Sequence, residues 1–186
     1  LQCQRCTIGH FRLGNLSLKS QSDGEQWQLT EFKTDYNGHR WQIRGEYQRG
    51  TEAQDLGRSS FDGELKSPAL GQLLHEYDVS SSLSGSPADV SFTGFNRKTL
   101  DGAVQWQLGE GSLSEVSDGG ARIFSLLSLD SLVRKLRLDF RDVFAKGFFF
   151  SSMTGTMTLE QGVSHTADTE VIGAAGDIQM QGYADL

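Results

Sequence analysis

A five-residue pattern recurs along this chain without a fixed period: an apolar residue, a variable residue, glycine, a variable residue and a second apolar or small residue. Because side chains alternate across a β-strand, the glycine and its two flanking apolar residues share one face. Glycine weakens a strand interior unless a bend or a closely approaching group requires it. We therefore predict strands with one apolar face, in a sheet bent around something apolar. The copies are residues 43–47, 61–65, 100–104, 153–157 and 180–184.

Alternating runs elsewhere predict further strands. Asn37-Gly38 separates two such runs, and this dipeptide between alternating segments is a strong hairpin signal, so we expect antiparallel neighbours. The polar residues 50–59 are expected to form a loop, and the serine-rich residues 79–88 a loose connection. The predicted strands are residues 11–19, 27–33, 40–47, 60–66, 89–95, 99–108, 111–116, 148–160, 163–172 and 177–186.

Two stretches follow a helical period instead. Residues 68–77 begin with Pro68 and place leucines three and four positions apart, which predicts a short helix. A longer apolar stripe runs through residues 129–144, with Ser128 suited to cap its start and Gly147 to end it. We expect a helix pair within residues 122–146, with the two helices meeting near Asp139.

Length and composition fit one mainly β unit. The chain has 186 residues, 22 glycines and two prolines, which favours a mainly β fold with a few helices. The net charge of −7 argues against nucleic acid as a partner, and no stretch reaches the roughly 18 apolar residues of a spanning helix. The strand pattern continues to the last residues, so we expect one segment of a longer protein. Within it, residues 1–118 would be strand-rich, 119–146 helical and 147–186 closing strands.

Cys3 and Cys6 form a C-x-x-C motif with three open interpretations. A structural disulfide is favoured over free thiols, and metal or redox chemistry is the least favoured because two further ligands at suitable spacing are absent. A disulfide would require a local turn, since positions three apart on a straight strand face opposite sides. Such a bond fits an oxidising compartment.

The chain shows no recognisable catalytic motif. Its four histidines are scattered, and no nucleophile elbow, zinc helix or phosphate-binding glycine loop is present. Ser164 and His165 are neighbours on a predicted strand and should point to opposite faces, so they cannot readily share a proton. We predict a protein that is not an enzyme and needs neither a cofactor nor a metal.

The apolar strand faces carry two interpretations. Periodicity alone favours an ordinary closed core, whereas a single sheet would leave apolar surface uncovered, which is rare unless something binds there. Methionines on this face would suit a flexible ligand. The candidate contact residues are Trp41, Ile43, Tyr47, Phe61, Leu65, Phe92, Val104, Trp106, Leu108, Met153, Met157, Ile178 and Met180.

The predicted helical stretch is net basic inside an acidic chain. Arg134, Lys135 and Arg141 lie along it, together with Arg137 and Lys146. A basic amphipathic helix can lie on an anionic membrane surface or hold lipid headgroups. The simpler alternative, a helix packed on the sheet with solvated charges, is favoured by periodicity alone.

Two stretches of this sequence resemble a known family. Residues 119–132, 136–140 and 144–148 resemble the C-terminal region of AsmA-like proteins of Gram-negative bacteria, of the YhdP type. Residues 153–162 and 173–182 are similar to the closing strand pair of that family. The resemblance is specific from about Gly119 to Leu186; before that, only the strand style agrees.

The resemblance implies a long periplasmic protein, anchored in the inner membrane and folded as a curved, mostly antiparallel sheet that forms an open, taco-like groove. Such proteins are thought to carry phospholipids towards the outer membrane, and the family offers an apolar face rather than catalytic residues. Envelope protein partners stay unidentified. Two other classes remain open: a scaffolding β module acting by protein contacts, and a glycan-binding domain, for which Trp27, Trp41 and Trp106 would supply aromatic platforms.

Overall fold

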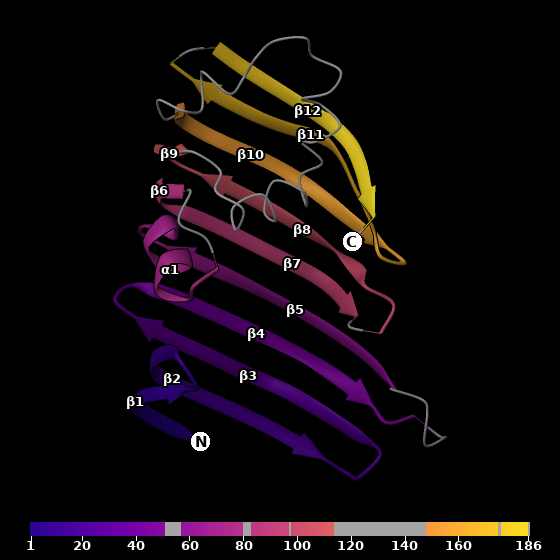
Figure 1. The fold of residues 1–186 in the computed structure, drawn as a ribbon. Helices are drawn as coiled ribbons and strands as arrows, with labels where there is room; N and C mark the ends of the chain where they lie inside the picture. The colour runs from indigo at the N-terminus through magenta and orange to yellow at the C-terminus, as the bar shows by residue number, and fades with distance from the viewer. Residues whose placement is uncertain (51–56, 80–82, 97, 114–147, 175, 186) are drawn as a thin grey trace.

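The computed structural model describes residues 1–50, 57–79, 83–96, 98–113, 148–174 and 176–185. Its main feature is one curved, open antiparallel sheet whose strands lie side by side in nearly chain order (Figure 1). The long strands are β2 (Phe11–Ser22), β3 (Gln26–Tyr36), β4 (His39–Gln48), β5 (Arg58–Ser67), β7 (Ala88–Asn96), β8 (Asp101–Leu108), β10 (Phe148–Glu160), β11 (Val163–Gly173) and β12 (Gly176–Asp185). The expected fold class, a curved mostly antiparallel sheet that does not close, is confirmed.

Three short elements gather at one end of the strands: α1 (Leu70–Glu76), β6 (Leu83–Gly85) and β9 (Gly111–Leu113) (Figure 1). The helix predicted over residues 68–77 is present, with slightly narrower bounds. The expectation of a loose connection over residues 79–88 is wrong at β6, which pairs with β9. Strand β6 has only three residues and is held by its partner β9, so its alternation of apolar and polar residues is too short to predict a strand from the sequence.

Strand β1 (Gln2–Ile8) was not predicted and pairs with β2 at the edge of the sheet. Its residues are mostly exposed and do not alternate, so burial leaves no signal in this part of the sequence. Cys3 and Cys6 form a disulfide, and the β1–β2 register shifts between them. The shift supplies the local irregularity that a bond between positions three apart requires.

Aspartate side chains lie at two of the irregular points of the sheet. Asp168 lies where the β11–β12 register shifts, and its carboxylate accepts bonds from the Thr156 backbone N–H at 2.8 Å and hydroxyl at 2.9 Å. Asp62 accepts the Gly94 N–H at 2.9 Å beside the shift in β7. Each carboxylate thus accepts a hydrogen bond from a backbone N–H group near an interruption of the regular strand pairing. Backbone N–H groups need such a partner where the neighbouring strand does not provide one.

The best-buried core lies under the short elements and in the C-terminal half of the sheet. Phe148, Phe150 and Leu113 are buried with residues of β8, β10, β11 and β12, and Leu70 and Leu83 pack against them. Strands β6 and β9 belong to the sheet itself, because β9 pairs with β10 and β6 pairs with β9, and α1 contacts β6 at this end. The helix pair predicted within residues 122–146 lies outside the described residues.

Candidate functional site

All thirteen candidate contact residues lie on one face of the sheet, which we call the apolar face. The register pairs Trp41 with Leu65, Leu65 with Val90, and Val90 with Trp106. These residues form a row that crosses the strands, and a parallel row runs beside it. The second row is Leu18, Phe32, Ile43, Gly63, Phe92, Val104 and Met157.

The remaining candidates occupy flanking positions on the same face. Leu108 pairs with Met153, which also pairs with Val171, and Val171 pairs with Ile178. Phe61 and Tyr47 pair with Gly45 and Trp27 respectively, while Met180 pairs with Thr169. None of the rows contains an aspartate, glutamate, lysine or arginine among these paired positions. The apolar surface is therefore continuous from β2 to β12.

The apolar face also contains residues that the sequence analysis did not single out. Phe32 and Leu29 both lie on it, although three positions separate them, because the β3–β4 register shifts between them. That shift reverses the parity of the strand, so simple alternation assigns one of the two to the wrong face. Phe148 and Phe150 are further additions, beside Leu18, Val90 and Val171 in the rows above. Phe148 and Phe150 lie two positions apart in the Phe148-Phe149-Phe150 run, a spacing that places both side chains on one strand face and could have identified them from the sequence.

Aromatic rings of neighbouring strands cover three glycines of the recurring pattern, Gly45, Gly63 and Gly155. A β-carbon placed on Gly63 would lie 2.6 Å from the Phe92 ring, and one on Gly155 would lie 2.5 Å from the Trp106 ring. Each ring belongs to the residue paired directly opposite its glycine. Glycine in a strand is required either by a bend or by the close approach of another group. At these glycines the approaching group is an aromatic side chain.

Coverage of the apolar face varies from residue to residue in both halves of the sheet. Trp106, Met153 and Met180 are 9%, 6% and 6% exposed, and Leu65 and Leu29, in the N-terminal half, are 5% and 7% exposed. The half-buried residues on this face include Trp41, Ile43, Tyr47, Phe61 and Phe92 in the N-terminal half and Val104, Met157 and Ile178 in the C-terminal half. Part of the apolar face is therefore accessible along the whole sheet.

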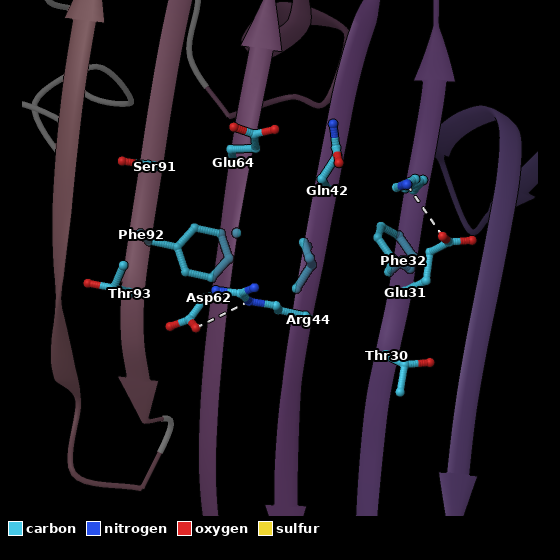
Figure 2. A pocket seen from close by; sticks show the side chains of 13 residues that line it. Thr30, Glu31, Phe32, Gln42, Arg44, Asp62, Glu64, Ser91, Phe92 and Thr93 are labelled. Carbon is cyan, nitrogen blue, oxygen red and sulfur yellow. Dashed lines mark ion pairs between the residues drawn. The ribbon is translucent and has the colours of Figure 1, made fainter.

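The opposite face is polar and carries the ion pairs. Lys19 and Lys33 lie 3.2 and 3.3 Å from the Glu31 carboxylate, and Arg44 lies 3.6 Å from Asp62. The hydrogen bond from Ser17 and those from the two lysines lower the pKa of Glu31 to about 2. A hollow of about 410 Å³ opens here between rows of polar side chains (Figure 2). Its mixed charges compensate one another, so this face selects no single ligand charge.

A buried polar group lies beneath α1. The His39 side chain, with the residue 2% exposed, shares a hydrogen bond of 2.8 Å between its Nδ1 and Ser67 Oγ. Burial lowers the pKa of His39, and the nearby Glu76 and Asp35 carboxylates oppose this shift. The Tyr77 hydroxyl, just after α1, donates to the Arg12 carbonyl at 3.1 Å. These contacts fasten α1 across the first strands rather than forming an open reaction site.

The remaining sequence predictions have separate outcomes. Ser164 is 2% exposed, whereas His165 is exposed, which agrees with the prediction that these neighbours point to opposite faces of their strand. Trp27, Trp41 and Trp106 all lie on the apolar face, where Trp106 is buried and the other two are half-buried, so only Trp27 and Trp41 could serve as aromatic platforms for a glycan. Arg134, Lys135 and Arg141 lie outside the described residues, so their placement stays a prediction.

Among the described residues, no group of histidine, cysteine, aspartate and glutamate side chains is arranged to hold a metal ion. No described helix combines the length and the apolar character needed to cross a membrane.

A single-layered, open sheet with one continuous apolar face and one charged face defines a class of β-proteins whose apolar surface is available for binding. The chain belongs to the YhdP family: a family model described as "YhdP protein" matches residues 1–186. This confirms the resemblance to AsmA-like proteins of the YhdP type. No solved structure matches the chain.

One curated relative is the "Intermembrane phospholipid transporter YhdP" of Escherichia coli (strain K12). It is 31% identical to this chain over 195 residues, an alignment that covers 100% of the chain. The chain spans 15% of the length of that relative, so it corresponds to a small part of a much longer protein. The similarity includes the N-terminal half, where the sequence analysis found agreement only in strand style.

Proposed function

We propose that the apolar face of this sheet holds phospholipid acyl chains, as one segment of a longer groove that moves lipids between the inner and outer membranes. The observation that carries the proposal is the pair of uncharged apolar rows that crosses the strands, of which the second row is half-buried along its whole length. The name of the Escherichia coli relative supports phospholipid as the cargo. The protein would act in the periplasm, without chemistry on the lipid, as part of a chain anchored in the inner membrane.

Energetics favour binding through the acyl chains. Each methylene moved from water to an apolar surface contributes about 0.8 kcal/mol, so affinity should follow apolar contact area more than headgroup identity. Because the rows run across the strands, an acyl chain lying along them contacts several strands at once. Ionised groups near this path would be costly to desolvate, and the rows hold none.

Site-specific photocrosslinking tests the proposal in the intact protein. A photoreactive amino acid replaces either Val104, on the apolar face, or its neighbour Gln105, which is exposed on the polar face. We expect phospholipid adducts at position 104 and few or none at position 105. Equal adducts at both positions, or none at position 104, would contradict the proposed path. Protein adducts in place of lipid at position 104 would favour the scaffolding alternative.

A charge placed in the row provides a second test. Val104→Asp should abolish lipid adducts at a photoreactive residue 43, because a buried carboxylate loses its hydration. The matched control is Gln105→Asp, which adds the same charge one residue away on the polar face and should leave the adducts unchanged. A folded Val104→Asp protein with unchanged adducts would refute the assignment of the row.

A further inference from the structure

We propose that Gly63 and Phe92, which are paired between β5 and β7, determine how far side chains project from the second apolar row into the apolar path, the space along that row where lipid would pass. A side chain at position 63 would therefore obstruct lipid passage. This inference rests on the proposed function. Gly63 lies in the second apolar row, between Ile43 and Phe92, where every other strand contributes a full side chain. The gap at Gly63 is filled by the Phe92 ring, which reaches across from the neighbouring strand (Figure 2).

The contacts indicate that the ring would yield most to a substitution. A β-carbon on Gly63 would lie 2.6 and 2.7 Å from Cζ and Cε1 of Phe92, which are far-end atoms of a rotatable side chain. The Gln42 carbonyl oxygen, at 2.9 Å, belongs to the sheet and must also shift, by less than the ring. Carbon atoms pack at about 3.5–4.0 Å, so the ring must retreat by about 1 Å for alanine and further for valine. The sheet blocks inward movement, and the ring therefore moves out into the apolar path.

Gly45 provides an informative contrast. A β-carbon there would lie 2.3 Å from Cδ1 of the Phe61 ring, but also 2.4 Å from the Ser60 carbonyl oxygen and 2.9 Å from the Phe61 Cα, which are backbone atoms. Substitution at Gly45 should therefore disturb the sheet itself as well as the ring. Gly63 is the better probe because its two closest obstacles are atoms of one half-buried ring.

The experiment uses the intact protein with a photoreactive residue at position 43 or 104, one on each side of the Gly63–Phe92 pair along the row. Phospholipid adducts are measured for the wild type, Gly63→Ala and Gly63→Val. We expect adducts to be retained on one side of the pair and reduced on the other, with a larger asymmetry for valine than for alanine. The matched control is Glu64→Val, which places the same side chain on the polar face and should leave both positions unchanged.

A compensating variant separates obstruction from a loss of structure. Phe92→Leu removes the ring, so Gly63→Ala combined with Phe92→Leu should restore adducts on the depleted side. A merely structural role predicts instead that adducts fall equally at both positions and that the second substitution does not restore them. That result, or unchanged adducts in a folded Gly63→Val protein, would overturn the inference. Absence of lipid adducts in the wild type would instead overturn the proposed function.

Discussion

The Phe148-Phe149-Phe150 run allows a direct test of which strand face forms the core. Phe150 is 2% exposed and belongs to the core cluster, whereas Phe149 is 64% exposed on the opposite face. The two side chains are chemically identical and adjacent, so their replacement by alanine changes the same atoms in two environments. Phe150→Ala should strongly lower the free energy of unfolding, and Phe149→Ala should barely change it.

The magnitude follows from the buried area. A phenylalanine side chain buries about 150–250 Å² when fully enclosed, which corresponds to about 4–6 kcal/mol at 25 cal/mol per Å². Measured losses for phenylalanine to alanine in cores are about 3–5 kcal/mol, so we expect about 4 kcal/mol for Phe150→Ala. The exposed Phe149 should contribute within about 0.5 kcal/mol. For a domain of this size, the Phe150 loss corresponds to a decrease in Tm of roughly 10 °C.

Urea denaturation followed by tryptophan fluorescence measures both free energies, since Trp106 belongs to the same core cluster as Phe150. The slope of unfolding free energy against urea concentration should stay the same in both variants if only stability changes. Comparable losses for the two alanine variants would refute the assignment of faces. A one-residue shift in register would produce that result, because it exchanges the two sides of the strand.

Two further predictions concern charge. Glu31→Gln should destabilise the protein at pH 7, because the folded-state pKa of about 2 lies below the ordinary 4.5; this stabilisation is present above pH 4.5 and is lost towards pH 2. A difference between wild type and variant in urea denaturation that does not shrink over that range would contradict the role of the ionised carboxylate. Replacing Arg134, Lys135 and Arg141 together by glutamine should weaken sedimentation with anionic vesicles, and less so in high salt. Wild-type protein that ignores such vesicles at low salt would contradict the predicted membrane contact.

The sequence predicted the apolar face well because the period of two holds between the register shifts, and without any shift in the pairing of β4 with β5 and of β8 with β10. Ile43, Phe92 and Val104 each share parity with the glycine or apolar residues around them, and strand pairing brings them into one row. That face is the part of the candidate site that sequence alone could supply. The alternation of residues predicts which side chains share this face, but it does not predict whether lipid contacts them.

The irregular points could not be predicted in the same way. The shift in β3 between Leu29 and Phe32 leaves both apolar residues on one face, and no local residue type announces it. At Asp168 the interruption depends on a carboxylate that reaches an amide on another strand, which is a tertiary contact. The aromatic partners of Gly63 and Gly155 likewise became known only with the register, because they lie on neighbouring strands.

The uneven burial of side chains on the apolar face separates effects on stability from effects on lipid passage. Phe150 and Trp106 belong to the buried core cluster, so their substitution mainly changes the free energy of unfolding. Phe92 is only half-buried, so a displaced ring can turn towards the accessible side of the face. A variant at Gly63 should therefore alter lipid adducts, whereas one at Phe150 should lower stability first. Measuring both quantities for both variants distinguishes a packed anchor from a path along the same sheet.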